Sequence, residues 1–506
     1  MSKGLLVKNS LVSVFQLLLT AVLTFIGVPI FIGKLGMELY GIWALVSVVG
    51  NLNVLTNLGL NNALIVFIAR QGKSKESDQD IVVTQILVIG IIAVFTSLAL
   101  FFNEFIINSI LSVPSEFMGE SLALFNFLIF SNGILLFGQT FTSIIDGLQK
   151  MYVTNSLQFI YSFIYWAGQI VVLSFGGRLY EVGLTAFIAA LIWFLIVFVV
   201  TKRMWGAYNL NGIRINFKSI AKKQLAYGSK MYVSGLTGFL LEPLSKILLS
   251  KYVGVNSVAF FEIGLKIKAV VNGLLTKALS PLFPFIAKAK DDSNLHEKLN
   301  DLSLKIKLLA IPIAFFIIFI IKIMLKFWLG DDNLDEVYVF VVTMSVSMIL
   351  LAPSCLPIFH YLSTKNMAEK TIWIQLSGVC MNIIVFFMTY ESIGLYAILI
   401  SNTLAIITSN LLCTYYRGKY LNFSFIREKT YFYKISIMII IILLPCLLIK
   451  YYLPLSIWEI PIFIVFISLG FVFSVRYLKL LNAEDVDRYF GSTNRVKSLL
   501  TKTFIA

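Results

Sequence analysis

Apolar segments long enough to cross a membrane recur along almost the whole chain. A hydrocarbon core of about 30 Å requires about twenty apolar residues in a helix, and about fourteen segments reach this length. They are predicted at residues 9–32, 39–68, 81–107, 121–147, 153–175, 182–201, 228–250, 256–287, 303–328, 337–362, 371–390, 393–415, 434–453 and 456–477. The pattern predicts an all-α polytopic membrane protein. Proteins with this many spans usually move a substrate across the membrane.

Several of these segments are apolar on only part of their circumference. Polar residues three or four positions apart lie on one face of a helix. Such faces contain Asn9, Ser13, Gln16, Thr20 and Thr24; Asn53, Asn57 and Asn61; Asn132, Gln139, Ser143 and Asp146; Asn155, Gln158, Ser162, Tyr165 and Gln169; and Lys268, Asn272, Thr276 and Ser280. One polar residue in a span often only joins two helices. Because unpaired polar groups are costly in hydrocarbon, this many polar faces favour a shared water-filled cavity.

Charged residues lie inside the seventh and eighth predicted segments. They are Glu242 and Lys246 in the seventh, and Glu262, Lys266, Lys268 and Lys277 in the eighth. Each such charge costs about 3 kcal/mol at the centre of a membrane helix, which disfavours contact with lipid. Glu242 and Lys246 are four residues apart and can pair, as can Glu262 and Lys266. The excess of lysine favours an anionic ligand, and the alternative is a set of internal ion pairs that hold the two helices in register.

The composition excludes an ordinary soluble protein. Of the 506 residues, 58% are hydrophobic and only 13% are charged, whereas about a quarter are charged in soluble domains. The net charge of +15 could indicate a nucleic-acid partner. However, about thirty of the 41 lysines and arginines fall in alternate loops and at the two termini, which is the positive-inside pattern of membrane proteins. We therefore expect both termini in the cytoplasm and no nucleic-acid binding.

The longest connection, from Lys202 to Lys230, divides the chain into two blocks of six spans. Its segment FKSIAKKQLAYGSK has apolar residues on one helical face and lysines on the other, which is typical of a helix on an anionic membrane surface. A solvated basic loop is the alternative. The predicted parts are an N-terminal lobe (1–203), a cytoplasmic linker (204–230), a C-terminal lobe (231–416), two further helices (417–478) and a cytoplasmic tail (479–506).

A short similarity relates the two blocks. The segment GMELYGIWAL from Gly36 is similar to GVNSVAFFEI from Gly254, at an offset of 218 (254 − 36). The match pairs Trp43 with Phe261 as well as the two glycines. It agrees with a transporter built from two repeated halves.

The motifs of soluble enzymes are missing from the sequence. It contains no phosphate-binding loop, no dinucleotide-binding loop and no nucleophile elbow, which excludes direct ATP-driven pumping by this chain. The four cysteines lie in apolar segments without metal-ligand spacing. We therefore expect no cofactor, and a gradient of H⁺ or Na⁺ as the energy source. Glu242, paired with Lys246, is the first candidate for ion coupling, and Asp146 and Glu262 are further candidates.

Four strings resemble a known family. LTNLGLNNALIVFIARQGKSKE from Leu55, SIIDGLQKMYVTN from Ser143, EPLSKILLSKYVGVNSVAFFEIGLKI from Glu242 and SPLFPFIAKA from Ser280 are similar, in pattern and order, to polysaccharide exporters of the Wzx type. These belong to the multidrug/oligosaccharidyl-lipid/polysaccharide superfamily, together with multidrug extruders and peptidoglycan precursor flippases. The likeness covers about residues 1–430.

The resemblance implies a fold and a function. It implies two six-helix lobes in a MATE-like arrangement around a central cavity, plus two C-terminal helices. The implied activity is flipping of an undecaprenyl-diphosphate-linked oligosaccharide, such as an O-antigen or capsule repeat unit, across the bacterial inner membrane by alternating access. A glycan polymerase and a chain-length regulator are further candidate partners, beside the membrane lipids. The substrate-binding candidates are Lys246, Lys266, Lys268, Lys277, Asn57, Gln139 and Gln158.

Two other functions compete with this one. A cation-coupled multidrug extruder of the same superfamily is disfavoured by the excess of lysine, because such pumps usually have acidic cavities. An integral-membrane glycan polymerase or ligase usually carries a large outer loop with catalytic residues. The predicted outer loops are short, which disfavours an enzyme.

Overall fold

The computed structural model is helical throughout the part of the chain that it describes. That part comprises residues 3–50, 58–209, 213–279, 292–330, 334–351, 355–365, 367–423, 425–452 and 458–481. In chain order the helices are α1 (Lys3–Gly50), α3 (Leu60–Gln71), α4 (Lys75–Phe101), α5 (Asn103–Phe105), η1 (Ile106–Ile110), η2 (Ser115–Phe117), α6 (Met118–Gly147), α7 (Met151–Ser174), α8 (Leu179–Trp205), α9 (Ile213–Tyr252), α10 (Val255–Leu279), α12 (Ser293–Leu329), α13 (Leu334–Leu351), α14 (Leu356–Thr364), α15 (Ala368–Ile393), η4 (Gly394–Tyr396), α16 (Ala397–Leu421), α17 (Phe425–Tyr452) and α18 (Glu459–Tyr477). The all-α prediction is confirmed.

Most predicted membrane segments coincide with long helices. Within the described residues, ten helical segments are long and apolar enough to cross a membrane. Two of them, Phe15–Val48 and Glu369–Leu421, each cover two predicted segments. The ten segments therefore cover about twelve of the predicted ones. Helices α9 and α10 are not among the ten, but they overlap with the seventh and eighth predicted segments, which brings the total to about fourteen. Helices α9 and α10 carry the charges that the sequence places within the membrane.

Described helix ends fall inside two of the predicted segments. The segment predicted at 39–68 contains the end of α1, residues 51–57 outside the described part, and then Leu58 and Gly59 at φ 45° and 71° before α3. A left-handed residue cannot continue a right-handed helix. The segment predicted at 337–362 contains the end of α13 and the start of α14, where Pro357 lies in the first turn and needs no N–H partner.

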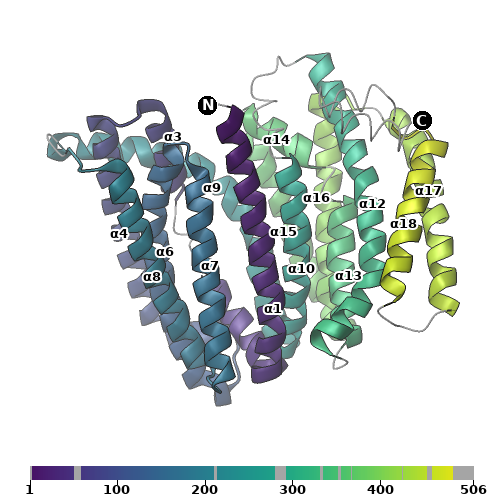
Figure 1. Ribbon diagram of the computed structural model, residues 1–506, viewed down its shortest axis with the longest axis horizontal. Helices are drawn as coiled ribbons and strands as arrows, with labels where there is room; N and C mark the ends of the chain where they lie inside the picture. The colour runs from purple at the N-terminus through teal and green to yellow at the C-terminus, as the bar shows by residue number, and fades with distance from the viewer. Residues whose placement is uncertain are drawn as a thin grey trace. The chain divides into compact units, whose positions relative to one another are not determined.

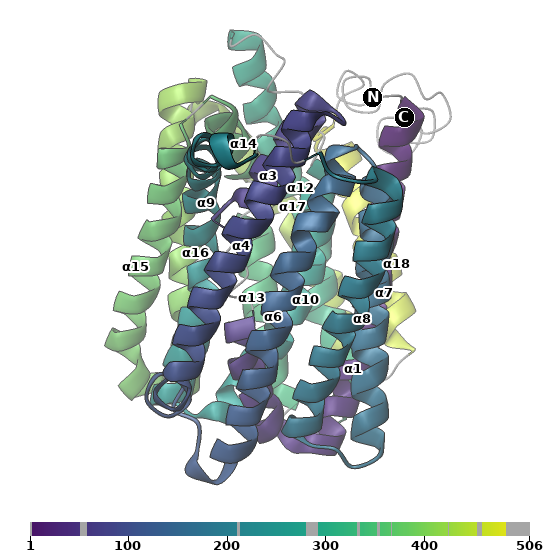
Figure 2. The same ribbon diagram turned by 90° about the vertical axis from the view of Figure 1, so that its left-hand side faces the viewer.

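Contacts divide the described helices into two units. The first comprises Met1–Glu262 with Phe386–Ile398, and the second comprises Ile263–Val385 with Leu399–Ala506. In the first, α4, α6, α7 and α8 run side by side (Figures 1 and 2), and α6 packs most extensively against α8. In the second, α12 packs against α13 and α18 around a core that includes Phe319. The predicted lobe boundaries stay a prediction.

Corresponding helices begin at a constant spacing. Helices α4 and α12 begin at Lys75 and Ser293, and α8 and α16 begin at Leu179 and Ala397, so both pairs are 218 residues apart (293 − 75 and 397 − 179). Left-handed turn residues follow the same offset: Gly36 and Gly254, Ser112 and Gly330, and Gly176 and Gly394. The similarity seen between Gly36 and Gly254 is therefore part of a repeat that continues through α8 and α16.

The starts of α4 and α12 also match in detail. Ser74 caps α4 by accepting a hydrogen bond from the backbone N–H of Ser77, and Asp292 caps α12 in the same way from Leu295. Side-chain oxygens at this position satisfy an N–H that has no partner within the helix. Both caps lie at the offset of the repeat (292 − 74), so the two halves share their helix starts as well as their turns.

Two glycines let the main chains of α3 and α9 touch. A Cβ added to Gly59 would lie 2.2 Å from the carbonyl oxygen of Gly228, and a Cβ added to Gly228 would lie 2.6 Å from that of Leu58. No other residue fits at either position unless the backbone moves. This contact holds α9 against the start of α3.

Candidate functional site

Three charged side chains meet on α9 and α10. The Nζ atom of Lys246 lies 2.6 Å from Glu262 Oε2 and 3.1 Å from Glu242 Oε1. Lys246 is 2% exposed and Glu262 is 7% exposed, whereas the side chain of Glu242 is 42% exposed. We call these three residues the charged triad. It contains two carboxylates and one ammonium, so its formal charge is negative.

Local structure explains how the triad forms. Glu242 and Lys246 are one helical turn apart on α9, and the pair predicted from this spacing is present. Gly254, at φ 126°, ends α9 and lets α10 return alongside it. Lys246 and Glu262 lie equally far from Gly254 along the chain, one on each side. The tight turn therefore brings them to the same level of the helical hairpin.

Aromatic side chains from α1 and α7 lie near Glu262. Glu262 lies within electrostatic reach of the hydroxyls of Tyr40 and Tyr165. Tyr40 is fully buried and stacks on Trp43 with ring centroids 5.4 Å apart, and Trp43 also contacts Phe31 at 5.0 Å. Aromatic walls of this kind exclude water, and ion pairs are stronger where water is excluded.

The remaining predicted lysines lie further along α10. Lys266 and Lys268 are half-buried. Lys277 is within α10, but its side chain lies outside the described part of the chain, and Asn57 lies wholly outside it. The structure thus brings Glu242, Lys246 and Glu262 together and places Lys266 and Lys268 on the same helix as Glu262.

Other predicted site residues have different partners. Gln139 on α6 accepts a hydrogen bond from Asn61 Nδ2 at 3.3 Å. Asp146, near the end of α6, accepts one from the hydroxyl of Thr154 at 2.7 Å. Gln158 is exposed on α7. Asp146 therefore ties the two helices that flank the α6–α7 turn, and the charged triad is formed without it.

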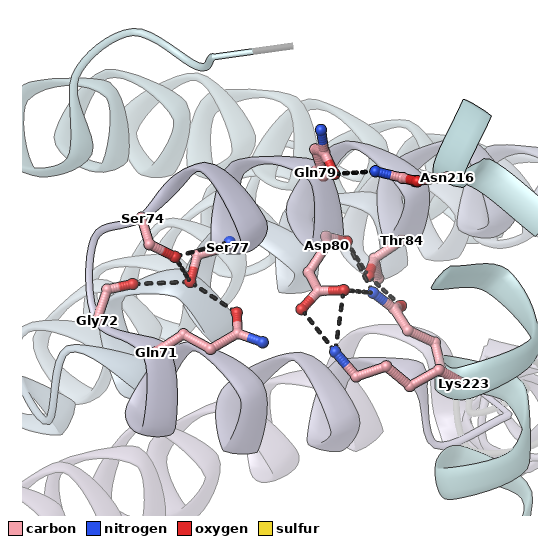
Figure 3. A network of polar contacts seen from close by, with 10 residues as sticks. Gln71, Gly72, Ser74, Ser77, Gln79, Asp80, Thr84, Asn216 and Lys223 are labelled. Atoms are coloured by element: carbon pink, nitrogen blue, oxygen red, sulfur yellow. Dashed lines mark hydrogen bonds and ion pairs between the residues drawn. The ribbon is translucent and has the colours of Figure 1, made fainter. Parts of the chain in front are cut away.

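The sequence did not reveal a second polar cluster, which joins the start of α4 to α9. Figure 3 shows Lys223 reaching the carboxylate of Asp80, with Nζ 3.1 Å from Oδ2. The amide of Gln224 donates to the backbone oxygen of Asp80 at 2.9 Å, and Thr84 donates to Gln224. Asn216 Nδ2 donates to Gln79 Oε1 at 3.3 Å. The side chain of Asp80 is only 2% exposed, whereas that of Lys223 is 45% exposed, so water reaches the lysine side of this contact.

Asp78 ties α4 to the end of α8 in the same region. Its carboxylate accepts hydrogen bonds from the indole N–H of Trp205 at 2.7 Å and from the backbone N–H of Asn209 at 2.8 Å. Lys73 donates to the last carbonyls of α8, those of Met204 and Trp205. We call Asp78, Trp205 and Asn209 the N-terminal junction.

The contacts of this polar cluster decide whether the linker segment is a helix or a solvated basic loop. Residues 213–230 of the predicted linker form the first part of α9, so the solvated basic loop is wrong. Ala221, Gln224 and Gly228 are buried, and α9 packs against α3 and α4. Two signals could have found this contact: the spacing of three and four between Ala221, Gln224 and Gly228, and the acidic pair Asp78 and Asp80 at a helix start. Contact of this helix with a membrane surface stays a prediction.

Comparison with protein families gives one match over more than half of the chain. The model of the family described as polysaccharide biosynthesis protein matches residues 6–290. This range includes α1 from residue 6 onward and all of α3 to α10, and therefore the whole charged triad and the N-terminal junction. Comparison with curated proteins finds no match.

Solved structures share the fold at low sequence identity. A lipid II flippase MurJ in an inward closed conformation is 16% identical, with a TM-score of 0.74 over 92% of this chain and 97% of that chain. An inward-facing multidrug resistance MATE family transporter of the MOP superfamily is 14% identical, with a TM-score of 0.62 over 82% and 98%. The MATE multidrug transporter DinF-BH is 15% identical, with a TM-score of 0.62 over 83% and 97%. The predicted MATE-like fold is confirmed.

Proposed function

We propose a function from the premise that this multi-pass membrane protein belongs to the polysaccharide biosynthesis protein family. The proposed activity is the flipping of an undecaprenyl-diphosphate-linked oligosaccharide, such as an O-antigen or capsule repeat unit. Its family and fold are those of flippases and transporters rather than enzymes. The observation that carries the proposal is the charged α9–α10 hairpin inside the family match. Charged groups within membrane helices are expensive and usually mark a substrate or ion pathway.

We assign different roles to the lysines of this hairpin. Lys246 is nearly inaccessible and shared by two carboxylates, so we place it in an internal ion-coupling element with Glu242 and Glu262. Lys266 and Lys268 are half-buried, and together with Lys277 they bind the diphosphate of the cargo. Asn57, Gln139 and Gln158 contact the sugars. Asp146 is a secondary coupling candidate.

The triad suits coupling to a cation because it has one negative charge in excess. A proton or Na⁺ that binds Glu242, its more exposed acid, neutralises this excess. Neutralising Glu242 weakens one of the two ion pairs of Lys246 within a region of low dielectric. Cation binding thereby changes the tie between α9 and α10 while the lobes alternate between their two openings. We expect the protein in the bacterial inner membrane with both termini in the cytoplasm, near a glycan polymerase and a chain-length regulator.

The proposal can be tested with purified protein in lipid vesicles. Lipid-linked oligosaccharide is placed in the inner leaflet, and its appearance outside is measured with an added glycosidase. We expect transfer by the wild type and a loss of about tenfold or more in Lys268→Ala, because a charge-assisted contact to phosphate is lost. Gln158→Ala serves as a milder comparison on an exposed α7 position. Wild-type transfer rates in Lys266→Ala and Lys268→Ala would refute the lysine assignment, and no transfer by the wild type would refute the cargo.

One observation favours a second candidate, a cation-coupled multidrug extruder. The triad carries more acid than base, although the lysine count of the sequence argued for an anionic cargo. Two of the similar solved structures are multidrug transporters. A panel of cationic drugs on cells with and without the protein separates the two functions. Increased resistance without any change in surface glycan would favour the extruder.

A further inference from the structure

The ammonium group of Lys246 occupies a position that would suit a bound cation. Its Nζ atom lies 2.6 Å from Glu262 Oε2 and 3.1 Å from Glu242 Oε1, so carboxylate oxygens from two helices converge on one point. Hard cations, of which Na⁺ is one, select sites where oxygens from several groups meet in this way. Lys246 is 2% exposed, so its charge is held inside the protein.

A further oxygen lies in the same region. The hydroxyl of Tyr40 on α1 is buried and has no hydrogen-bond partner among the residues that the structure describes. It lies within electrostatic reach of Glu262. A buried hydroxyl without a partner is costly, which makes it a ready neutral ligand for a cation beside the two carboxylates.

The repeat shows that the helical hairpin does not need these charges. In the N-terminal half the equivalent hairpin is α1, which bends at Gly36. At the offset of 218, the three residues of the charged triad correspond there to Thr24, Val28 and Ala44. Val28 and Ala44 are fully buried, so apolar side chains fill two of the three places. Because apolar residues can replace a buried ion pair at little or no cost in stability, the charges point to a role beyond folding.

A proton and Na⁺ differ in what they need from this site. A proton binds a single carboxylate oxygen, so Glu242, whose side chain is 42% exposed, can accept one while Lys246 stays in place. Na⁺ has to give up water and needs several oxygens at the same time. The point where the oxygens converge is filled by the Nζ atom of Lys246, and like charges repel strongly where water is excluded. The lysine therefore admits the proton and excludes Na⁺.

We propose that Lys246 is a tethered cation that determines which ion the charged triad accepts. It fills the place that Na⁺ would take and leaves only a proton to bind Glu242. This selectivity rests on the ion coupling assigned to the triad under the proposed function, but not on the identity of the cargo. It depends on the two ion pairs of Lys246, whatever other contacts Glu262 makes. The consequence is that a triad without its lysine becomes a Na⁺ site.

Binding of radiolabelled Na⁺ by the purified full-length protein in detergent tests the proposal. The substitution Lys246→Val introduces the residue that the N-terminal half has at the equivalent Val28, and it leaves both carboxylates. The buffer is alkaline, because two neighbouring carboxylates otherwise share a proton that competes with Na⁺. We expect saturable binding of about one Na⁺ per protein in Lys246→Val, and binding weaker by about tenfold or more in the wild type.

Three further variants separate the loss of the charge from other effects. Lys246→Arg keeps a positive charge between the carboxylates and should exclude Na⁺ as the wild type does. The double variant Lys246→Val with Glu262→Ala has the apolar pair of the N-terminal half and should bind no Na⁺, because only one carboxylate remains. Lys223→Ala is a matched control in another ion pair, where the single acid Asp80 is left alone, and it should bind no Na⁺ either.

Gel filtration and thermal unfolding show whether each variant is folded. If Lys246→Val does not fold, Lys246→Met, which keeps most of the aliphatic stem, takes its place in the same binding measurement. Na⁺ should also raise the unfolding temperature of the folded variant relative to choline at equal ionic strength, since a ligand of the folded state stabilises that state. The unfolding temperature of the wild type should be the same in the two salts.

Saturable Na⁺ binding by the wild type would overturn the proposal, as would its absence from whichever of Lys246→Val and Lys246→Met is folded. Binding that persists in the double variant would overturn it too, because Na⁺ would then bind outside the triad. The flipping assay gives a separate result. A wild type that fails to flip the lipid-linked oligosaccharide refutes the cargo, whereas the Na⁺ measurements still decide the role of Lys246.

Discussion

The two halves of the chain solve the same structural problem in opposite ways. In the N-terminal junction, Asp78 accepts hydrogen bonds from Trp205 and Asn209. In the C-terminal half the corresponding region is a cavity lined by His296, Arg417 and other polar residues. We call this region the C-terminal junction.

The comparison separates what the repeat maintains from what it allows to change. The helix starts and caps coincide at the offset of 218, so the frame is the same (292 − 74 and 293 − 75). The side chains between the helices differ: Asp78 and Trp205 in one half have His296 and Phe423 at the equivalent positions of the other. The same helix starts therefore tolerate different side chains at the two junctions.

The largest effect is expected at the N-terminal junction. Asp78→Ala removes the acceptor of the Trp205 indole in a buried place, and should lower the free energy of unfolding by about 3 kcal/mol. Its counterpart, His296→Ala, lines a cavity and should cost less than about 1 kcal/mol. Thermal unfolding of the two purified variants in the same detergent measures the difference. Equal losses would mean that the junctions are not functionally different.

The polar wall of the C-terminal junction should behave as one unit. Arg417→Val and Asn300→Val each remove the hydrogen bonds between these two side chains and should cost about 2 kcal/mol. The double variant has valine at both positions, as the N-terminal half has at the equivalent Val199 and Val82, and should cost less than the sum by about 1–2 kcal/mol. A double-mutant cycle by chemical denaturation gives this coupling energy. Strict additivity would show that the two side chains act independently.

The contact between α4 and α9 should have a smaller effect. Asp80→Asn removes the charge that faces Lys223, whose side chain is 45% exposed and therefore screened by water. We expect a loss of about 1 kcal/mol, after allowing for this exposure. Lys298 occupies the position equivalent to Asp80 in the other half (298 − 80 = 218), and Lys298→Ala should change stability very little. Protease cleavage near residue 213 should become faster in Asp80→Asn alone.

The smallest effect concerns a turn. Ser112 and Gly330 occupy equivalent left-handed positions, at φ 54° and 87°. Ser112→Gly relieves backbone strain and should stabilise the protein by about 0.5 kcal/mol, whereas Gly330→Ser should destabilise it by about 1 kcal/mol. Open space surrounds Gly330, so a steric clash does not confuse the result. Melting temperatures that move in the same direction in both variants would contradict the equivalence.

The sequence predicted the helices well because hydrophobic length is a strong signal. The all-α fold and most of the membrane segments followed from it. The left-handed residues Leu58 and Gly59 before α3 were missed, since such residues act locally inside a run that remains apolar. Hydropathy averages over these positions.

The candidate site was only partly predictable. The pair of Glu242 and Lys246 followed from helical spacing, but the contact of Lys246 with Glu262 depends on the turn at Gly254 and on the packing of two helices. Asp78 and Asp80 looked like ordinary acids at a helix start, which are favourable there without any distant partner. Their contacts with Trp205, Lys223 and Gln224 join residues more than a hundred positions apart, and no local pattern contains that information.

The constant spacing of the two halves has a consequence for helical phase. One extra residue inside a helix turns everything beyond it by about 100° around the axis. Inserted in α12 before Asn300, it would swing Asn300 and Asp301 away from Arg417 and present polar groups to lipid. Between a cap such as Asp292 and a turn such as Gly330, single insertions should therefore be far more harmful than the loss of one side chain.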